Sequence, residues 1–189
     1  MGLHSMWAHG TAFAPPEHPS EGLENVDNVP YTDVLGFRWG GGAVWKGDPG
    51  SANWLHVSIP TPVVVNSAAA SLKRVFVLFS TGQGLSGQGL GGPTLTDVHV
   101  WDGASRIQMF GNVQGWGDRR TSLDSNNTFA LSSSTPISFG VGISVRVQFE
   151  TIGDQRIEFA GAGAEFELPS LIFRIFPLER FRRSSSAGG

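Results

Sequence analysis

The sequence predicts an all-β protein, a single antiparallel β-sandwich of jelly-roll-like or immunoglobulin-like type, with a closed β-barrel as the alternative. The first observation is composition. Of the 189 residues, 26 are glycine and only 15% are charged, and no long run of helix-forming Ala, Leu, Glu and Lys occurs. The second is the recurrent period-two alternation of apolar and polar residues. The third is the regular appearance of Gly, Pro, Asn and Asp between the alternating segments.

The first part of the chain predicts two extended segments separated by an irregular one. Residues 5–13 alternate and form the first strand. Four prolines make the stretch from Ala14 to Pro30 an irregular excursion. Residues 34–45 are extended again, but glycines at 40–42 interrupt them, and we expect a bulge or a sharp bend there.

The middle of the chain predicts an edge strand and a buried strand. Residues 48–50, Asp-Pro-Gly, form a turn, and a strand at 54–60 follows it. Because Pro60 and Pro62 cannot donate ladder hydrogen bonds, we expect this strand at a sheet edge. Residues 71–80 carry apolar side chains on both faces, which is typical of a buried strand.

The C-terminal part predicts further strands. Residues 94–112 predict a hairpin whose turn is Asp102-Gly103. The clearest alternation lies at 137–150, where every second residue from Val141 to Phe149 is apolar and faces the core. We expect the segment 155–168 to pair with it across the short turn between them. A last strand is predicted at 170–176.

The length of the chain suits one hydrophobic core. We therefore expect a single β-sandwich domain over residues 1–176. Residues 177–189 are basic and then Ser/Gly-rich, a composition that predicts a disordered tail.

Charge and composition exclude several classes of function. The formal net charge of -3 gives no general attraction to nucleic acid, and the absence of cysteine excludes disulfides, iron–sulfur clusters and a cysteine nucleophile. The five histidines form neither an H-x-H nor an H-E-x-x-H pattern, so we expect no metal and no cofactor. No segment has the roughly 18 apolar residues of a membrane span, and the N-terminal stretch lacks the regions of a signal peptide. We expect a cytoplasmic protein without a membrane span.

Two predicted strands carry the same pair of side chains on the face away from their aliphatic residues. Trp54 and His56 share that face of one strand, and His99 and Trp101 share it on the other, together with Asp97. Neighbours on one face of a strand lie about 7 Å apart. If the two faces converge, they form a Trp-walled site with two imidazoles. The other interpretation is that both faces are buried and the histidines bond to backbone groups.

A site of this kind suits a small apolar or sugar-like molecule, with Trp54 and Trp101 as ligand-binding walls. If the site is catalytic, His56 or His99 acts as general acid or base and Asp97 orients an imidazole.

Two further residues are candidate ligand contacts. Arg38 lies between two aromatic residues and could stack on them or bind a carboxylate, with a surface salt bridge as the alternative. Trp116 lies in a glycine-flanked loop, where an exposed indole suggests a ligand or partner. Packing of that loop onto the sandwich explains Trp116 equally well.

Several segments resemble a set of small microbial all-β proteins that open on a similar W-x-H-G stretch. The resemblance covers most of Met6 to Phe149 and implies a single compact domain, but it assigns no catalytic residue. The segments that carry it are Met6–Thr11, Asn53–His56, Ile59–Pro62, Asp97–Gly103 and residues 139–149.

Three functions from different classes remain open. The first, which we expect, is small-molecule binding at the Trp/His site. The second is cofactor-free conversion of a hydrophobic metabolite by a cyclase, isomerase or lyase. The third is a structural or assembly subunit that forms a homo-oligomer, with the Gly-rich loops and residues 173–183 docking onto neighbours.

Overall fold

The computed structural model describes residues 2–14, 36–65, 68–81, 92–152 and 155–168. The predicted excursion at 14–30, the last strand at 170–176 and the tail at 177–189 lie wholly or almost wholly outside these ranges. Within the described ranges the chain is built of β-strands with one short 3-10 helix, and no helix there is long and apolar enough to cross a membrane. The elements are β1 (Gly2–His9), η1 (Gly10–Ala12), β2 (Gly36–Trp39), β3 (Gly42–Lys46), β4 (Ala52–Ile59), β5 (Val64–Val65), β6 (Ala68–Ala69), β7 (Ser71–Ser80), β8 (Thr94–Asp102), β9 (Ser105–Gly115), β10 (Thr128–Pro136), β11 (Val141–Gln148) and β12 (Arg156–Leu168).

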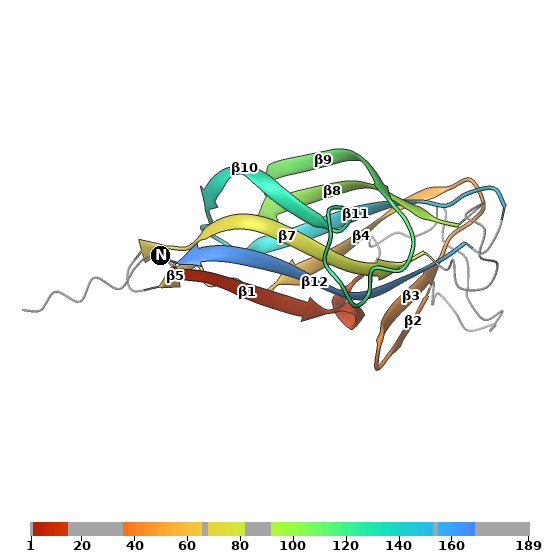
Figure 1. The fold of residues 1–189 in the computed structure, drawn as a ribbon, viewed down its shortest axis with the longest axis horizontal. Helices are drawn as coiled ribbons and strands as arrows, with labels where there is room; N and C mark the ends of the chain where they lie inside the picture. Colours follow the sequence, from red (N-terminus) through yellow and green to blue (C-terminus); the bar gives the residue numbers. More distant parts are fainter. Residues whose placement is uncertain (1, 15–35, 66–67, 82–91, 153–154, 169–189) are drawn as a thin grey trace, which may run out of the picture.

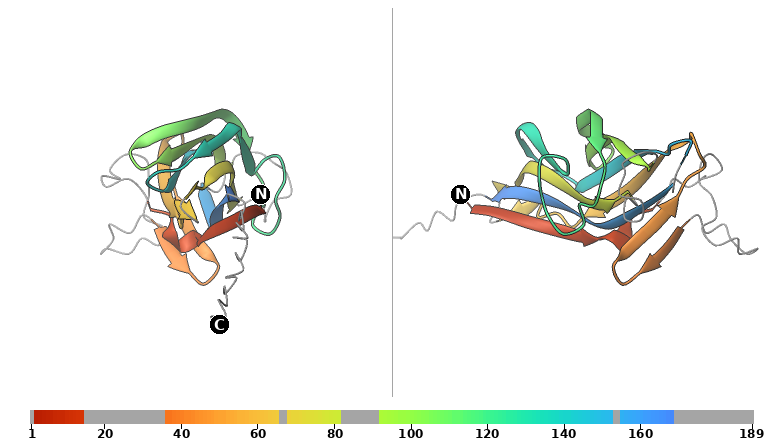
Figure 2. Two further views of the ribbon diagram at one scale, coloured as in Figure 1. Left: turned by 90° about the vertical axis from the view of Figure 1, so that its left-hand side faces the viewer. Right: turned by 45° about the vertical axis from the view of Figure 1, so that its right-hand side comes forward.

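Two antiparallel sheets form the sandwich (Figure 1). The 6-stranded sheet has the order β10-β7-β12-β3-β2, and β1 also pairs with β12. The 4-stranded sheet has the order β4-β11-β8-β9. Figure 2 shows β8 and β9 on the opposite side of the molecule from β1. The sandwich class is thus confirmed. The barrel alternative is wrong for the described residues, because the two sheets keep separate ladders there.

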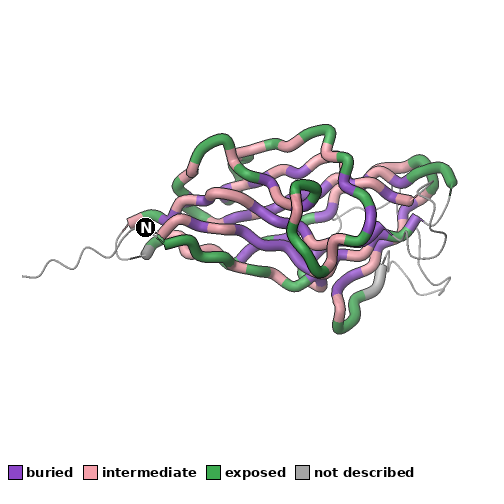
Figure 3. Tube along the Cα trace, in the orientation of Figure 1, coloured by how far each residue is buried: buried purple, intermediate pink, exposed green. Residues whose placement is uncertain are grey.

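The core lies between the two sheets. In β11 every second residue faces this core, because successive side chains of a strand point to opposite faces. Its inward residues are at most 2% exposed, as the sequence predicts. Each such side chain contributes about 1.5–3 kcal/mol relative to an exposed one. Figure 3 shows buried residues along the middle of the molecule. The inward residues of this segment are Val141, Ile143, Val145, Val147 and Phe149.

The pairing of the strands bears on three expectations from the sequence. The strand after the Asp-Pro-Gly turn, β4, is an edge strand, which confirms the prediction from Pro60 and Pro62. The glycine interruption at 40–42 is a sharp bend, the turn of the β2–β3 hairpin. The expected pairing of 155–168 with the preceding strand is wrong. After β11 the chain crosses to the other sheet, where β12 pairs with β7, β3 and β1.

The β8–β9 hairpin is present, but its turn lies one residue later than predicted. Asp102 pairs with Ser105, so the turn residues are Gly103 and Ala104. Gly103 has φ 56, a left-handed conformation that favours glycine. The carboxylate of Asp102 is engaged elsewhere, on the turn that precedes β11.

Candidate functional site

The candidate site lies on the outer face of the 4-stranded sheet, where β11 runs between β4 and β8. In the ladder, Ser144 of β11 stands between His56 of β4 and His99 of β8. One row along, Gly142 pairs with Trp101. This central strand brings the two Trp/His motifs onto a common surface, which we call the Trp/His face and define by Trp54, His56, His99 and Trp101.

Three rings form a continuous aromatic strip on this face. The rings of Trp54 and His99 have centroids 4.4 Å apart at an interplanar angle of 38°. His99 then contacts Trp101 edge-on, with centroids 6.2 Å apart. Gly142 lies beside Trp101, since a Cβ built there would be 3.6 Å from the Trp101 Cβ. The rings remain partly exposed, so their surface is available to a ligand.

A buried hydroxyl connects the two motifs. The indole Nε1–H of Trp101 donates to Ser144 Oγ at 3.0 Å, and Ser144 Oγ also lies 2.8 Å from His56 Nδ1. Ser144 itself is only 6% exposed. Because the indole can only donate, Ser144 Oγ accepts that bond; toward His56 Nδ1 the hydroxyl can donate its proton or accept a second bond, according to the tautomer of His56.

Burial affects the protonation of His56. Burial lowers the pKa of His56 below its usual value, which favours the neutral imidazole at neutral pH. A neutral imidazole that accepts at Nδ1 carries its proton on Nε2. Only part of the imidazole is buried, and the residue as a whole remains exposed at the surface.

The second histidine has a different environment. Burial lowers the pKa of His99, the charge of Arg106 lowers it further, and Asp97 acts in the opposite direction. The carboxylate of Asp97 forms an ion pair with Arg146 Nη1 at 3.6 Å. Arg146 also donates to Thr96 Oγ1 at 3.1 Å. Asp97 is thus held by an arginine from β11, and its predicted role as the orienter of an imidazole stays a prediction.

A hollow of about 510 Å³ lies at one end of the aromatic strip. This volume falls within the range of about 300–1,000 Å³ typical of small-molecule sites. Its floor is the outer surface of β4, β11 and β8, and the segment that follows η1 forms a wall. Its lining includes Ala14, His56, Ser58, Trp101, Gly103 and Ser144.

Arg38 supports the wall of this hollow. Its Nε donates to the carbonyl oxygen of Thr11 at 2.8 Å and its Nη2 to that of Phe13 at 3.2 Å. The guanidinium also lies 5.8 Å from the centre of the Trp45 ring. The next residue, Ala14, exchanges two backbone hydrogen bonds with His56, at 2.9 and 2.8 Å. Arg38 therefore holds the backbone of the segment that forms the wall of the hollow. Its direct contact with a ligand stays a prediction.

Trp116 lies away from the described lining of the hollow. Its side chain is 53% exposed, although the loop that carries it is fixed. The backbone N–H of Gly117 donates to Thr81 Oγ1 at 2.9 Å, and Thr81 N–H donates to the carbonyl oxygen of Gly117 at 3.2 Å. A role of Trp116 in ligand binding stays a prediction.

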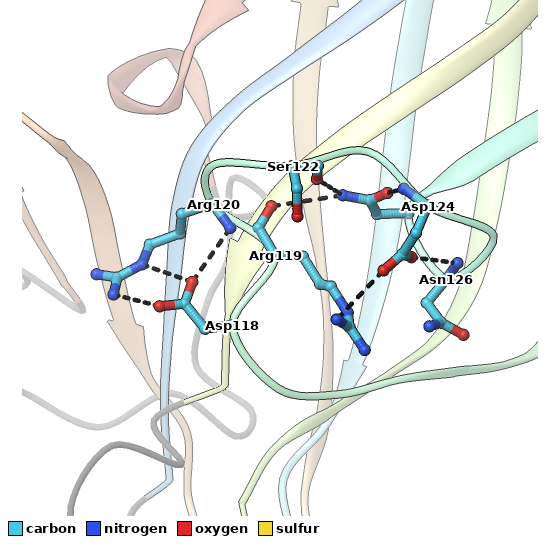
Figure 4. Close-up of polar contacts among 7 residues, drawn as sticks. Asp118, Arg119, Arg120, Ser122, Asp124 and Asn126 are labelled. Carbon is cyan, nitrogen blue, oxygen red and sulfur yellow. Dashed lines mark hydrogen bonds and ion pairs between the residues drawn. The ribbon is translucent and has the colours of Figure 1, made fainter.

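The charged residues after Trp116 pair with one another (Figure 4). Arg120 binds Asp118 at 2.6 Å and Glu158 of β12 at 2.7 Å, and the Arg120 hydrogen bond holds the pKa of Asp118 below its usual value. Arg119 pairs with Asp124 at 3.2 Å. These contacts fasten the loop to the 6-stranded sheet. In the part of the chain that the structure describes, no group of three or more His, Cys, Asp and Glu residues could hold a metal ion.

Sequence reasoning missed the part played by Ser144. The alternation along β11 places this serine on the outward face, but the residue bonds to side chains 88 and 43 positions away. The sequence did place the Ser144 hydroxyl on the outward face of this strand, together with Gly142, Arg146 and Gln148. Only the strand order connects that hydroxyl with His56 and Trp101.

Comparison with known proteins gives a weak likeness to solved structures. No family model matches the chain, and no curated protein matches it. Among solved structures, it is similar to a family 35 carbohydrate-binding module from Clostridium thermocellum, with 15% sequence identity and a TM-score of 0.28. The match covers 80% of this chain and 96% of that chain. A likeness at this level carries no information about a ligand.

Proposed function

We propose that this protein binds a small sugar-like molecule on the Trp/His face. The observation that carries the proposal is the aromatic strip of Trp54, His99 and Trp101 beside a largely apolar hollow to which His56, Ser58 and Ser144 contribute polar groups. Indole rings offer large, rigid apolar surfaces, and the C–H face of a sugar ring is an apolar surface of matching shape. Such contacts need little reordering because the rings already pack on one another.

Polar groups at the same place favour a sugar over a purely apolar ligand. The exposed His56 imidazole and the exposed Ser58 hydroxyl lie on the same face, and each can donate or accept a hydrogen bond. Sugar hydroxyls need partners of both kinds. A site with a few convergent polar groups and aromatic walls is the usual form of a small-molecule site.

Conversion of the ligand is a second proposal that the same residues allow. His56 and His99 are the candidate acid and base, and the hydrogen bond between Ser144 Oγ and His56 Nδ1 holds one imidazole in a defined orientation. This activity requires that a bound molecule is consumed. Self-association as an assembly subunit rests on a C-terminal segment that lies outside the described residues.

The experiment is calorimetric titration of the purified protein with unbranched gluco-, xylo-, manno- and chito-oligosaccharides. We expect one series to bind, and Trp54→Ala and Trp101→Ala each to weaken its binding by about tenfold or more, equivalent to about 1.4 kcal/mol. Trp39→Ala is the matched control, because this indole is 50% exposed on β2, a strand of the 6-stranded sheet, and is no part of the Trp/His face. Binding that is equal in all four proteins would contradict the proposal.

A further inference from the structure

Phe139 is the most exposed of the large hydrophobic residues that the structure describes. Its side chain is 81% exposed, on the turn that links β10 to β11. A single exposed apolar side chain is ordinary on a protein surface. Phe139 differs in two respects: its backbone is held rigidly, and it borders the hollow of the Trp/His face.

A carboxylate holds the turn in place. Asp102 accepts backbone N–H bonds from Ser138 at 2.8 Å, from Phe139 at 2.7 Å and from Gly140 at 3.0 Å. Burial of this carboxylate acts to raise its pKa, but the three hydrogen bonds outweigh burial and hold the pKa of Asp102 below its usual value. On the far side of the turn, Val141 N–H donates to Thr61 Oγ1 at 2.9 Å.

The turn stands next to the hollow. Gly103 lines the hollow, and its N–H donates to the carbonyl oxygen of Gly140 at 3.0 Å. A Cβ built on Gly103 would lie only 3.0 Å from the Cβ of Phe139, so the phenylalanine packs against this glycine. Asp102 directly follows Trp101 in the chain. The residue that anchors the turn is therefore joined to the last ring of the aromatic strip.

We propose that Phe139 is a further ligand-contacting residue, an outer subsite that receives the second ring of a sugar chain extending from the hollow past Gly103. This inference rests on the proposed function and specifies its ligand as an oligosaccharide. An aromatic side chain on a backbone that is already ordered contributes affinity at a small entropic cost. The exposure of Phe139 leaves its ring surface free for that contact.

The test uses the oligosaccharide series that binds best in the titrations above, as its monosaccharide and its hexasaccharide. Phe139→Ala is expected to weaken hexasaccharide binding by about fivefold and to leave monosaccharide binding unchanged, since it removes one aromatic contact. Phe139→Trp is expected to restore hexasaccharide binding. Ile152→Ala is the control, because Ile152 is 66% exposed and lies outside the lining of the hollow.

The outcomes separate this inference from the proposed function. If Phe139→Ala binds both ligands like the parent protein while Trp101→Ala loses both, the subsite is refuted and binding at the Trp/His face stands. If Phe139→Ala weakens both ligands equally, Phe139 contacts the first ring and the outer subsite is also refuted. If the parent protein binds no member of the panel, both proposals are contradicted. Because Phe139 is so exposed, its replacement leaves the core unchanged, and a thermal melt checks this.

Discussion

Replacing Asp102 by asparagine tests the clamp on the turn before β11. In the parent protein, Oδ1 accepts from Phe139 and Gly140 and Oδ2 accepts from Ser138. An asparagine in the same position keeps one carbonyl oxygen for two of these bonds. Its amide NH₂ then faces the N–H of Ser138, so one bond is lost and two donors oppose each other.

The cost follows from these contacts. Leaving a buried donor without a partner costs about 1–3 kcal/mol, and hydrogen bonds to a charged acceptor are at the upper end of the usual range. We expect Asp102→Asn to lower the free energy of unfolding by about 2 kcal/mol. For a domain of this size that corresponds to a fall in Tm of about 4–8 °C.

The same clamp predicts a pH dependence. Because folding lowers the pKa of Asp102, its contribution to stability is present above the ordinary value of 3.8 and is lost as the pH falls through the folded-state pKa. Urea denaturation of both proteins at neutral and at acidic pH measures the difference. We expect the gap between parent and variant to shrink in acid, where the parent loses its charge.

The control is Glu150→Gln, a change at an exposed carboxylate, which is expected to alter stability by less than about 0.5 kcal/mol. Equal stability of Asp102→Asn and the parent at neutral pH would refute the clamp. A gap that does not change with pH would show that the charge of Asp102 is not involved.

Four more changes give separate tests. Ser144→Ala removes the partner of His56 and Trp101 and is expected to lower the free energy of unfolding by about 1–3 kcal/mol in denaturation; unchanged stability would show that these two bonds contribute nothing. In the parent, burial lowers the pKa of His56 relative to the unfolded chain, so the unfolded chain takes up the proton first as the pH falls below 6.5. Protonation of His56 therefore lowers the free energy of unfolding in acid. His56→Gln should remove this residue's share of the loss of stability, as measured by denaturation across that pH range. Arg38→Ala removes two bonds to the wall of the hollow and is expected to weaken saccharide binding severalfold in calorimetry; unchanged binding would show that the wall does not matter. Gly163→Ala places a Cβ 2.7 Å from the Trp7 indole and is expected to cost about 1–3 kcal/mol in thermal melts, and a neutral effect would contradict the close packing of that ring.

Local patterns predicted much of this fold because they depend on neighbouring residues. The alternation from Val141 to Phe149 gives the buried face of β11, and the prolines after β4 give its place at a sheet edge. The same alternation places Trp54, His56, His99 and Trp101 on the faces away from the aliphatic rows.

Long-range pairing could not be predicted in this way. The partner of β12 depends on which sheet offers the better packing, and the chain crosses the sandwich where a short hairpin was expected. The convergence of the two Trp/His motifs depends on β11 lying between β4 and β8. The turn of the β8–β9 hairpin lies one residue late, and Asp102 binds a turn 36 to 38 residues further along the chain.

Binding of a sugar-like ligand on the aromatic strip of the 4-stranded sheet is tested most directly by titration of ¹⁵N-labelled protein with the same oligosaccharide panel, followed through the indole N–H signals in NMR spectra. We expect the signals of Trp54 and Trp101 to shift together and saturably, while that of Trp39 stays in place. Saturable binding that leaves Trp54 and Trp101 unmoved, or the absence of any shift across the panel, would contradict this expectation.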